Sequence, residues 1–474
     1  MVLKVINHSF GYDMKNICTV FFPYEKIREQ GREDVTVITE MKNGELIADA
    51  SAYDRRVKKT HILLQNEDTA TAMSVLLYNA LSELTGYKPP WGILFGVRPA
   101  KLMHRFTEMY GEEGAIKYFT DNFLTSPSKA RLAAEVMKHE NCTIAMSSEN
   151  SFSLYVSIPF CPTRCSYCSF VSHSIERTQK LMEPYTDLLC RELERTAQIA
   201  KELNLRLETI YFGGGTPTTL SPLQLKKLFN TIEKSFDLST LREYTVEAGR
   251  PDTVSAEKLN VLKNAGVTRI SINPQTFNDD VLKNIGRRHT VMQTVEAFEL
   301  ARNMGFDNIN TDLIAGLPGD CLESFKASVD KASALGADSV TVHTLALKSA
   351  SYMVTRENTF DLTDRLTTAR MVEYSIQCLT DKEYYPYYMY RQSKSLGNLE
   401  NVGWCRKGRD CLYNVFMMDE THSVFAVGAG AVTRLKDQKT GYIERIYNYK
   451  YPYEYIDNFS EILSRKEGIL KFYK

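Results

Sequence analysis

The sequence predicts an α/β protein in which a partial (β/α)6 TIM-like barrel lies between an N-terminal α+β domain and a C-terminal α/β extension. In the middle of the chain, six short β-rich runs alternate with amphipathic helical patterns. That alternation is typical of a parallel sheet. It is absent before and after this stretch, and 474 residues exceed what one hydrophobic core usually serves. We therefore expect domains at 1–147, 148–350 and 351–474.

The N-terminal domain is predicted from short β-rich runs followed by longer helical patterns. Strands are expected at 19–22, 35–38 and 61–64, and helices at 67–85, 98–110, 112–121 and 127–140. The string GVRPAK at 96–101 is interpreted as a helix start, because Pro99 suits the first turn of a helix. A contact of its basic residues with an acidic substrate is the alternative.

The barrel is predicted from six strand patterns, each followed by at least one helical pattern. The strands are expected at 154–158, 209–212, 244–247, 269–272, 308–314 and 339–343. The helices are expected at 177–204, 221–235, 255–264, 278–285, 291–304 and 321–335. Gly266, Gly305 and Gly336 each follow a helical pattern, where a left-handed C-terminal cap is favoured. Beyond residue 350 a helix is expected at 362–380, followed by the tyrosine-rich segment 384–390.

Composition excludes several classes of protein. Lys plus Arg equals Asp plus Glu at 58 each, so no overall field would attract nucleic acid or an anionic membrane. No stretch approaches the roughly 18 apolar residues of a membrane span, and the N-terminus has no signal-peptide pattern. Ten cysteines in 474 residues are too sparse for a disulfide scaffold. We expect a cytoplasmic protein with no nucleic-acid partner and no membrane span.

Three of the ten cysteines form the compact motif CxxxCxxC directly after the first barrel strand. Cys161, Cys165 and Cys168 fall within eight residues. Soft thiolates select iron–sulfur clusters or zinc, and a cubane held by only three thiolates leaves one iron open to another ligand. The alternative is a structural zinc site completed by His173.

Further polar residues follow the later strands, at the barrel edge where active sites are built. Gly213, Gly214, Gly215 and Thr216 end the second strand, and consecutive glycines let a backbone approach a ligand closely. The remaining candidates are Glu247, Asn273, Gln275, Asp312 and His343. A carboxylate such as Asp312 suits a ribose diol, whereas Arg287, Arg288 and Lys348 suit carboxylates.

These motifs, in this order, resemble the radical S-adenosylmethionine (SAM) superfamily, and within it the oxygen-independent coproporphyrinogen III oxidases. The front domain with GVRP makes the chain most similar to the HemZ branch. The resemblance implies a radical SAM barrel with one [4Fe–4S] cluster on the three cysteines. It places Tyr155 and Tyr167 near the cluster. The positions implied to contact SAM are Gly213, Gly214, Gly215, Thr216, Glu247, Gln275, Arg287 and Asp312. No catalytic side chain is implied, because the cofactors generate the radical.

The implied activity is the anaerobic oxidative decarboxylation of two propionates of coproporphyrinogen III to vinyl groups, in haem biosynthesis. An electron donor such as flavodoxin or ferredoxin is implied. Arg391, Arg406, Arg409 and the tyrosines of 384–390 are candidates for a pocket around this tetracarboxylate. A solvated basic face and an ordinary aromatic core explain these residues equally well. Phe170 stands where characterised coproporphyrinogen dehydrogenases have a further cysteine, as it does in the related HemW proteins. A haem-binding chaperone and a radical SAM methyltransferase acting on haem are therefore the alternatives.

Overall fold

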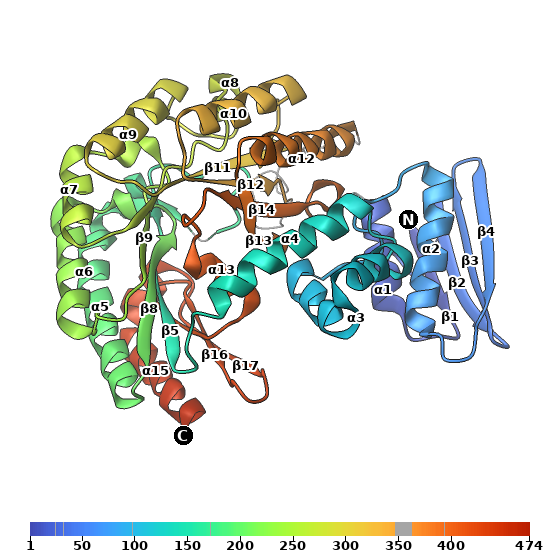
Figure 1. Ribbon diagram of the computed structural model, residues 1–474, viewed down its shortest axis with the longest axis horizontal. Helices are drawn as coiled ribbons and strands as arrows, with labels where there is room; N and C mark the ends of the chain where they lie inside the picture. The colour runs from blue at the N-terminus through green and yellow to red at the C-terminus, as the bar shows by residue number, and fades with distance from the viewer. Residues whose placement is uncertain (24, 32, 97, 171, 347–362, 393) are drawn as a thin grey trace. The chain divides into compact units, whose positions relative to one another are not determined.

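The computed structural model describes residues 1–474 except 24, 32, 97, 171, 347–362 and 393 (Figure 1). The chain forms two compact units. The first comprises Met1–Met137 with Met389–Glu400, and the second comprises Lys138–Tyr388 with Asn401–Lys474. The division of the second unit at residue 350 and the boundary at 147 stay predictions. Among the described residues, no helix is long and apolar enough to cross a membrane.

The first unit is built on a four-stranded sheet in the order β1-β2-β3-β4. Strand β1 is parallel to β2, and β2, β3 and β4 form an antiparallel meander. The elements are β1 (Val2–Ile6), α1 (Gly11–Phe21), β2 (Val35–Lys42), β3 (Glu45–Ala52), β4 (Arg55–Ile62), α2 (Thr69–Thr85) and α3 (Pro99–Asn122). Helix α4 (Pro127–Ile144) begins in this unit. The predicted α+β character is confirmed.

The predicted strand at 19–22 is wrong, because these residues end helix α1 and lead out of it. Met14, Ile17, Cys18 and Phe21 are buried at helical spacing on one face of α1. Burial of that face outweighs the β propensity of a Thr-Val-Phe run. The two helices predicted at 98–110 and 112–121 are confirmed: α3 consists of two helical segments separated at Gly111, whose φ of 72° and ψ of 171° are not helical.

The second unit contains the predicted βα alternation. Its first part comprises β5 (Ser151–Ile158), β6 (Phe160–Cys161), β7 (His173–Ser174), α5 (Ile175–Glu202), β8 (Arg206–Gly214), α6 (Pro222–Ser235), β9 (Glu243–Glu247), α7 (Ala256–Asn264), β10 (Arg269–Ser271), α8 (Asp279–Asn284), α9 (Val291–Asn303), β11 (Ile309–Ala315), α10 (Leu322–Ala334) and β12 (Ser339–Thr344). Short 3-10 turns η1 (Pro217–Thr219) and η2 (Pro251–Thr253) follow β8 and β9. Gly266, Gly305 and Gly336 have φ of 77°, 82° and 72°, as the predicted helix caps require.

The C-terminal part adds strands to the same sheet. Its elements are α12 (Thr363–Asp381), β13 (Tyr385–Arg391), η3 (Leu396–Asn398), β14 (Glu400–Cys405), α13 (Leu412–Asp419), β15 (Ser423–Val427), β16 (Val432–Lys436), β17 (Ile443–Tyr447), α14 (Pro452–Asp457) and α15 (Phe459–Tyr473). The strand order is β13-β14-β12-β11-β10-β9-β8-β5-β15-β16-β17. The six central strands are parallel, from β12 to β5. They form a partial (β/α)6 barrel, with α5, α6, α7 and α9 along its outer side (Figure 1).

The two faces of this sheet differ in chemistry, because successive side chains of a strand point to opposite faces. Towards the helices the strands present apolar side chains; the rings of Phe212 and Tyr244 both pack against Phe229 of α6. The opposite face is polar, and its side chains bond between strands, as Arg269 does to Ser339 at 2.9 Å. TIM barrels usually fill this interior with apolar layers. A polar interior instead offers the lining of a binding site.

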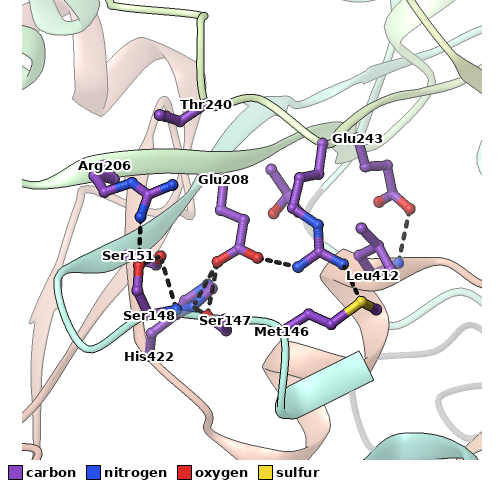
Figure 2. Close-up of polar contacts among 12 residues, drawn as sticks. Met146, Ser147, Ser148, Ser151, Arg206, Glu208, Thr240, Glu243, Leu412 and His422 are labelled. Atoms are coloured by element: carbon purple, nitrogen blue, oxygen red, sulfur yellow. Dashed lines mark hydrogen bonds and ion pairs between the residues drawn. The ribbon is translucent and has the colours of Figure 1, made fainter. Parts of the chain in front are cut away.

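At the amino ends of the strands the polar groups form a closed network around Glu208 of β8 (Figure 2). The Ser147 hydroxyl donates to one Glu208 oxygen at 2.7 Å, and Arg242 forms an ion pair with the other. His422 lies between Ser147, at 3.0 Å from Nδ1, and Ser153, at 2.8 Å from Nε2. These bonds join β5, β8 and the segments that enter β9 and β15. They fix the register of the sheet.

Candidate functional site

The three cysteines lie in a loop at the carboxyl end of β5. The ends of this loop pair with each other, because Phe160 of β6 lies opposite His173 of β7. Its middle is bound to the turn after α8: Ser166 N–H donates to Ile285 O at 3.0 Å, and the Thr163 hydroxyl donates to Gly286 O at 3.0 Å. The loop is therefore anchored to two separate parts of the barrel.

All three cysteines are free thiols, with Cys165 buried and Cys161 and Cys168 partly exposed. Nowhere in the described part of the chain do three His, Cys, Asp or Glu side chains converge on a point that one metal ion would occupy. His173, the fourth ligand of the zinc alternative, packs its ring edge-on against Tyr451, with 5.8 Å between the ring centroids.

The glycine turn after β8 lies directly against the cysteine loop. Gly215 N–H donates to Ile158 O at 2.7 Å, and the Thr216 hydroxyl lies 3.5 Å from Cys161 Sγ. A Cβ on Gly215 would stand 2.5 Å from Phe160 O and 3.0 Å from Cys161 Sγ. No larger residue fits there without moving the backbone, so the glycines permit this close approach.

Three tyrosine rings stack beneath the glycine turn on the inner face of the sheet. Tyr155 of β5, Tyr211 of β8 and Tyr413 of α13 form a triangle of near-parallel rings. The ring centroids are 6.2 Å apart for Tyr155 and Tyr211, 4.5 Å for Tyr211 and Tyr413, and 6.0 Å for Tyr155 and Tyr413. The Tyr211 hydroxyl donates to Glu247 Oε1 at 2.6 Å. Burial raises the pKa of Glu247 to about 7, and the negative charge of Asp312 acts in the same direction. Glu247 therefore changes protonation near neutral pH.

Asp312 of β11 lies on the same inner face. Asn310 Nδ2 donates to Asp312 Oδ1 at 2.7 Å, and His343 Nε2 lies 3.6 Å from Oδ2. Burial alone would raise the pKa of Asp312, but its contacts with His343 and Asn310 outweigh that effect and lower it. Gln275 bonds through its backbone to Asp312 O at 2.9 Å and adopts φ of 72°, which is uncommon for a residue other than glycine.

Arg287 is a buried cation at this edge of the barrel. Its Nη1 donates to Asn273 O at 2.5 Å, and its Nη2 lies 3.3 Å from the hydroxyl of Tyr167 in the cysteine loop. Its Nε is buried and has no hydrogen-bond partner among the described residues. Arg269 and Arg391 also have a buried Nε without a partner among the described residues. What distinguishes Arg287 is its position beside the cysteine loop, where a ligand oxygen would satisfy this costly donor.

The thirteen predicted site residues lie in the loops at the carboxyl ends of the parallel strands or on the strands themselves, with Tyr155 and Asp312 in the middle of β5 and β11: Tyr155, Cys161, Cys165, Tyr167, Cys168, Gly213, Gly214, Gly215, Thr216, Glu247, Gln275, Arg287 and Asp312. Their roles as ligands remain proposals. Arg288 is instead exposed and paired with Glu176 at 2.8 Å, and Lys348 lies outside the described residues.

The candidates for a tetrapyrrole pocket have structural contacts. Arg391 is 3% exposed, donates to Leu94 O at 2.6 Å and stacks over Trp91 within the first unit. Arg406 lies over the ring of Tyr384, and Arg409 pairs with Asp307 at 3.4 Å. Of the segment 384–390, residues 384 and 386–389 are buried. These contacts give no support to a substrate role for the three arginines.

Some polar residues of the site were not predicted. Tyr211, Tyr413, Arg250 and Arg269 carry no motif by themselves. The available signal for the two strand residues, Tyr211 and Arg269, was period-2 alternation, because polar side chains recur at every second position of several barrel strands. Arg250 and Tyr413 lie outside strands, and only the folded chain brings them to the site.

Comparisons with known proteins agree with this geometry. The radical SAM superfamily model matches residues 155–332. The oxygen-independent coproporphyrinogen-III oxidase-like protein HemZ of Bacillus subtilis is 37% identical over 398 residues, which are 83% of this chain and 79% of that protein. Heme chaperone HemW of the same organism is 41% identical over 224 residues, which are 47% of this chain and 58% of HemW.

The solved structure of coproporphyrinogen III oxidase (HemN) from Escherichia coli, a radical SAM enzyme, matches with a TM-score of 0.52 and 22% identity. The match covers 70% of this chain and 72% of HemN, and it shows the shared fold. The extent of the HemZ match shows the family. The chain belongs to the radical SAM superfamily and, within it, to the family of oxygen-independent coproporphyrinogen III oxidase-like proteins that includes HemZ.

Proposed function

We propose that this protein is a radical SAM oxidoreductase that decarboxylates two propionates of coproporphyrinogen III to vinyl groups without oxygen. Family membership implies a [4Fe–4S] cluster and SAM as cofactors. The observation that carries the proposal is the meeting of three free thiols, a glycine turn and the orphaned Arg287 Nε at one edge of the barrel. When bound, the two cofactors supply a radical that abstracts hydrogen from a propionate side chain.

The thiol set fits the cluster. Cys161, Cys165 and Cys168 would each bind one iron and leave a fourth iron open, as three thiolates on a cubane require. The glycine turn packs directly against this loop, since a Cβ on Gly215 would lie 3.0 Å from Cys161 Sγ. The turn therefore brings the end of β8 into contact with the loop that would hold the cluster.

The remaining polar groups fit SAM, which carries a carboxylate, an amino group and a ribose diol. Arg287 Nε would donate to the carboxylate, because Arg is suited to binding carboxylate oxygens. Asp312 stays ionised at neutral pH, so its oxygens would accept hydrogen bonds from the ribose hydroxyls. Glu247, with a pKa raised to about 7 by burial, holds a proton part of the time. Asp312 would thus act only as a hydrogen-bond acceptor, whereas Glu247 would donate a hydrogen bond when protonated and accept one when ionised.

A haem-binding chaperone is the second candidate function. Phe170 is 67% exposed at the position of the further cysteine, and HemW shares 41% identity with about half of this chain. Both candidates retain the cluster loop, so the fold alone does not separate them.

Reconstituted protein incubated without oxygen with SAM, dithionite and coproporphyrinogen III separates these functions. The proposal predicts 5′-deoxyadenosine together with tri- and dicarboxylic porphyrins after oxidation, resolved by chromatography. Formation of deoxyadenosine without decarboxylated porphyrin would contradict the proposal that coproporphyrinogen III is the substrate, but it would leave the radical chemistry intact. Haem binding without SAM cleavage would favour the chaperone, and a methylated haem would indicate the methyltransferase.

A further inference from the structure

Arg250 is a buried cation beside the cysteine loop to which the motifs assign no role. It follows β9 and precedes η2, and it is 2% exposed. Its backbone oxygen accepts the Thr253 hydroxyl at 2.7 Å, which fixes the turn that carries it. A buried guanidinium needs compensating charge or hydrogen bonds, so its contacts indicate what it does.

The contacts of Arg250 point in two directions. Its Nε and Nη2 bind the two carboxylate oxygens of Asp252, at 3.2 Å each. Its Nη1 points away from Asp252, 3.1 Å from the Thr163 hydroxyl and 3.9 Å from Cys165 Sγ. The planar guanidinium holds its donors in a rigid fork. Asp252 therefore orients the group so that one N–H faces the sulfur of Cys165.

A positive N–H donor at a cluster thiolate affects the two redox states of the cluster unequally. Reduction adds one negative charge to the cluster, and a nearby cation stabilises the more negative state more strongly. Hydrogen bonds and charge near the sulfurs are established controls of cluster potential. At a buried site such interactions are weakly screened. Asp252 acts in the opposite sense, because its charge opposes reduction.

We propose that Arg250 is a positioning residue that raises the reduction potential of the cluster through Cys165, and that Asp252 both orients Arg250 and limits the effect. This inference rests on the proposed cluster. Arg287 also interacts electrostatically with Cys165, but its substitution would change the proposed SAM binding as well. The contacts of Arg250 are with Thr163, Cys165 and Asp252, none of which is proposed to bind SAM. Its effect on the cluster can therefore be measured separately from SAM binding.

The test is a redox titration of the reconstituted full chain without SAM, followed by EPR of the reduced cluster. Wild type is compared with Arg250→Gln, Arg250→Lys and Asp252→Asn, after iron and sulfide content has been matched. We expect a lower midpoint potential for Arg250→Gln, a value near wild type for Arg250→Lys, and a higher midpoint for Asp252→Asn. If the ion pair of Arg250 and Asp252 only stabilised the fold, Arg250→Gln and Asp252→Asn would not shift the midpoint potential in opposite directions.

The inference is overturned if Arg250→Gln and Asp252→Asn shift the midpoint in the same direction or leave it unchanged. If Arg250→Gln does not assemble a cluster, Asp252→Asn still decides, because the amide is nearly isosteric with the carboxylate and a rise in its midpoint is required. A wild-type chain that assembles no four-iron cluster would overturn the proposed function and this inference with it. Unchanged potentials on an intact cluster would overturn the inference alone.

Discussion

The same parallel strands carry polar side chains at both ends, yet the two ends differ in how those groups are satisfied. At the amino ends, both Glu208 oxygens have partners, and both ring nitrogens of His422 face hydroxyls (Figure 2). At the carboxyl ends, Arg287 Nε has no acceptor in the part of the chain that the structure describes. Gln275 there has a left-handed backbone. The network around Glu208 is complete without a ligand, whereas the group of polar residues around Arg287 is not.

The ionisable groups show the same difference. The amino-end network has one consistent proton arrangement: Ser147 donates to Glu208, so His422 Nδ1–H donates to Ser147 and Nε2 accepts from Ser153. Burial lowers the pKa of His422 to about 4, so the ring stays neutral at pH 7. At the carboxyl end burial raises the pKa of Glu247 to about 7. A barrel of this type thus gains stability at one end and retains costly polar groups for binding at the other.

The largest expected effect on stability is at the amino end. Glu208→Ala removes the acceptor of Ser147 and the partner of Arg242, and should destabilise the folded chain by about 3 kcal/mol. Thermal unfolding of purified protein measures this as a fall in midpoint temperature. Arg206→Ala, at the exposed start of the same strand, is the matched control and should change stability by less than about 0.5 kcal/mol. Equal effects of the two variants would contradict the comparison.

Glu247→Gln should have the opposite effect at the carboxyl end. Glu247 has a pKa of about 7 in the folded chain, against an ordinary value of 4.5. The folded chain therefore loses stability as the pH rises from about 4.5 to about 7. Wild type without SAM should therefore be less stable than Glu247→Gln by about 3 kcal/mol near pH 8. The difference should vanish below about pH 4.5. Unfolding temperatures measured across this range test the sign, and a variant that is less stable at alkaline pH would refute it.

The smallest effect is expected from Tyr211→Phe. The Tyr211 hydroxyl donates to Glu247 and lowers its pKa, in opposition to burial. Its removal should move the alkaline loss of stability to higher pH and cost about 1 kcal/mol near pH 8. Tyr413→Phe keeps the ring that stacks on Tyr211 at 4.5 Å and should leave the pH profile unchanged. A profile that does not respond to Tyr211→Phe would show that this bond does not control Glu247.

Most of the barrel could be predicted because its helices and strands have distinct hydrophobic periods. The six predicted strands match β5, β8, β9, β10, β11 and β12 within a few residues. The prediction failed at 19–22, where tertiary burial overrode local β propensity. Strands β14 to β17 were not predicted to join the sheet, since pairing between distant segments leaves no local pattern.

The candidate site was predictable to the extent that it is written in motifs. The cysteine spacing and the triple glycine are contiguous in sequence, so their chemistry could be inferred before the fold. Arg250 could not be found in this way, because its contact with Cys165 joins residues 85 positions apart. The closed network at Glu208 was likewise hidden, since His422 and Ser153 are 269 positions apart.

The most direct test of the central claim, that the carboxyl end holds an open-iron cluster with SAM, is metal analysis and EPR of chain prepared without oxygen. The account predicts about four irons and four sulfides per chain. It also predicts a reduced-cluster EPR signal that changes when SAM is added. Cys165→Ala should abolish both, whereas the matched control Cys321→Ala, at an exposed cysteine, should retain them. A colourless protein with one zinc per chain, or a cluster signal that SAM does not alter, would contradict it.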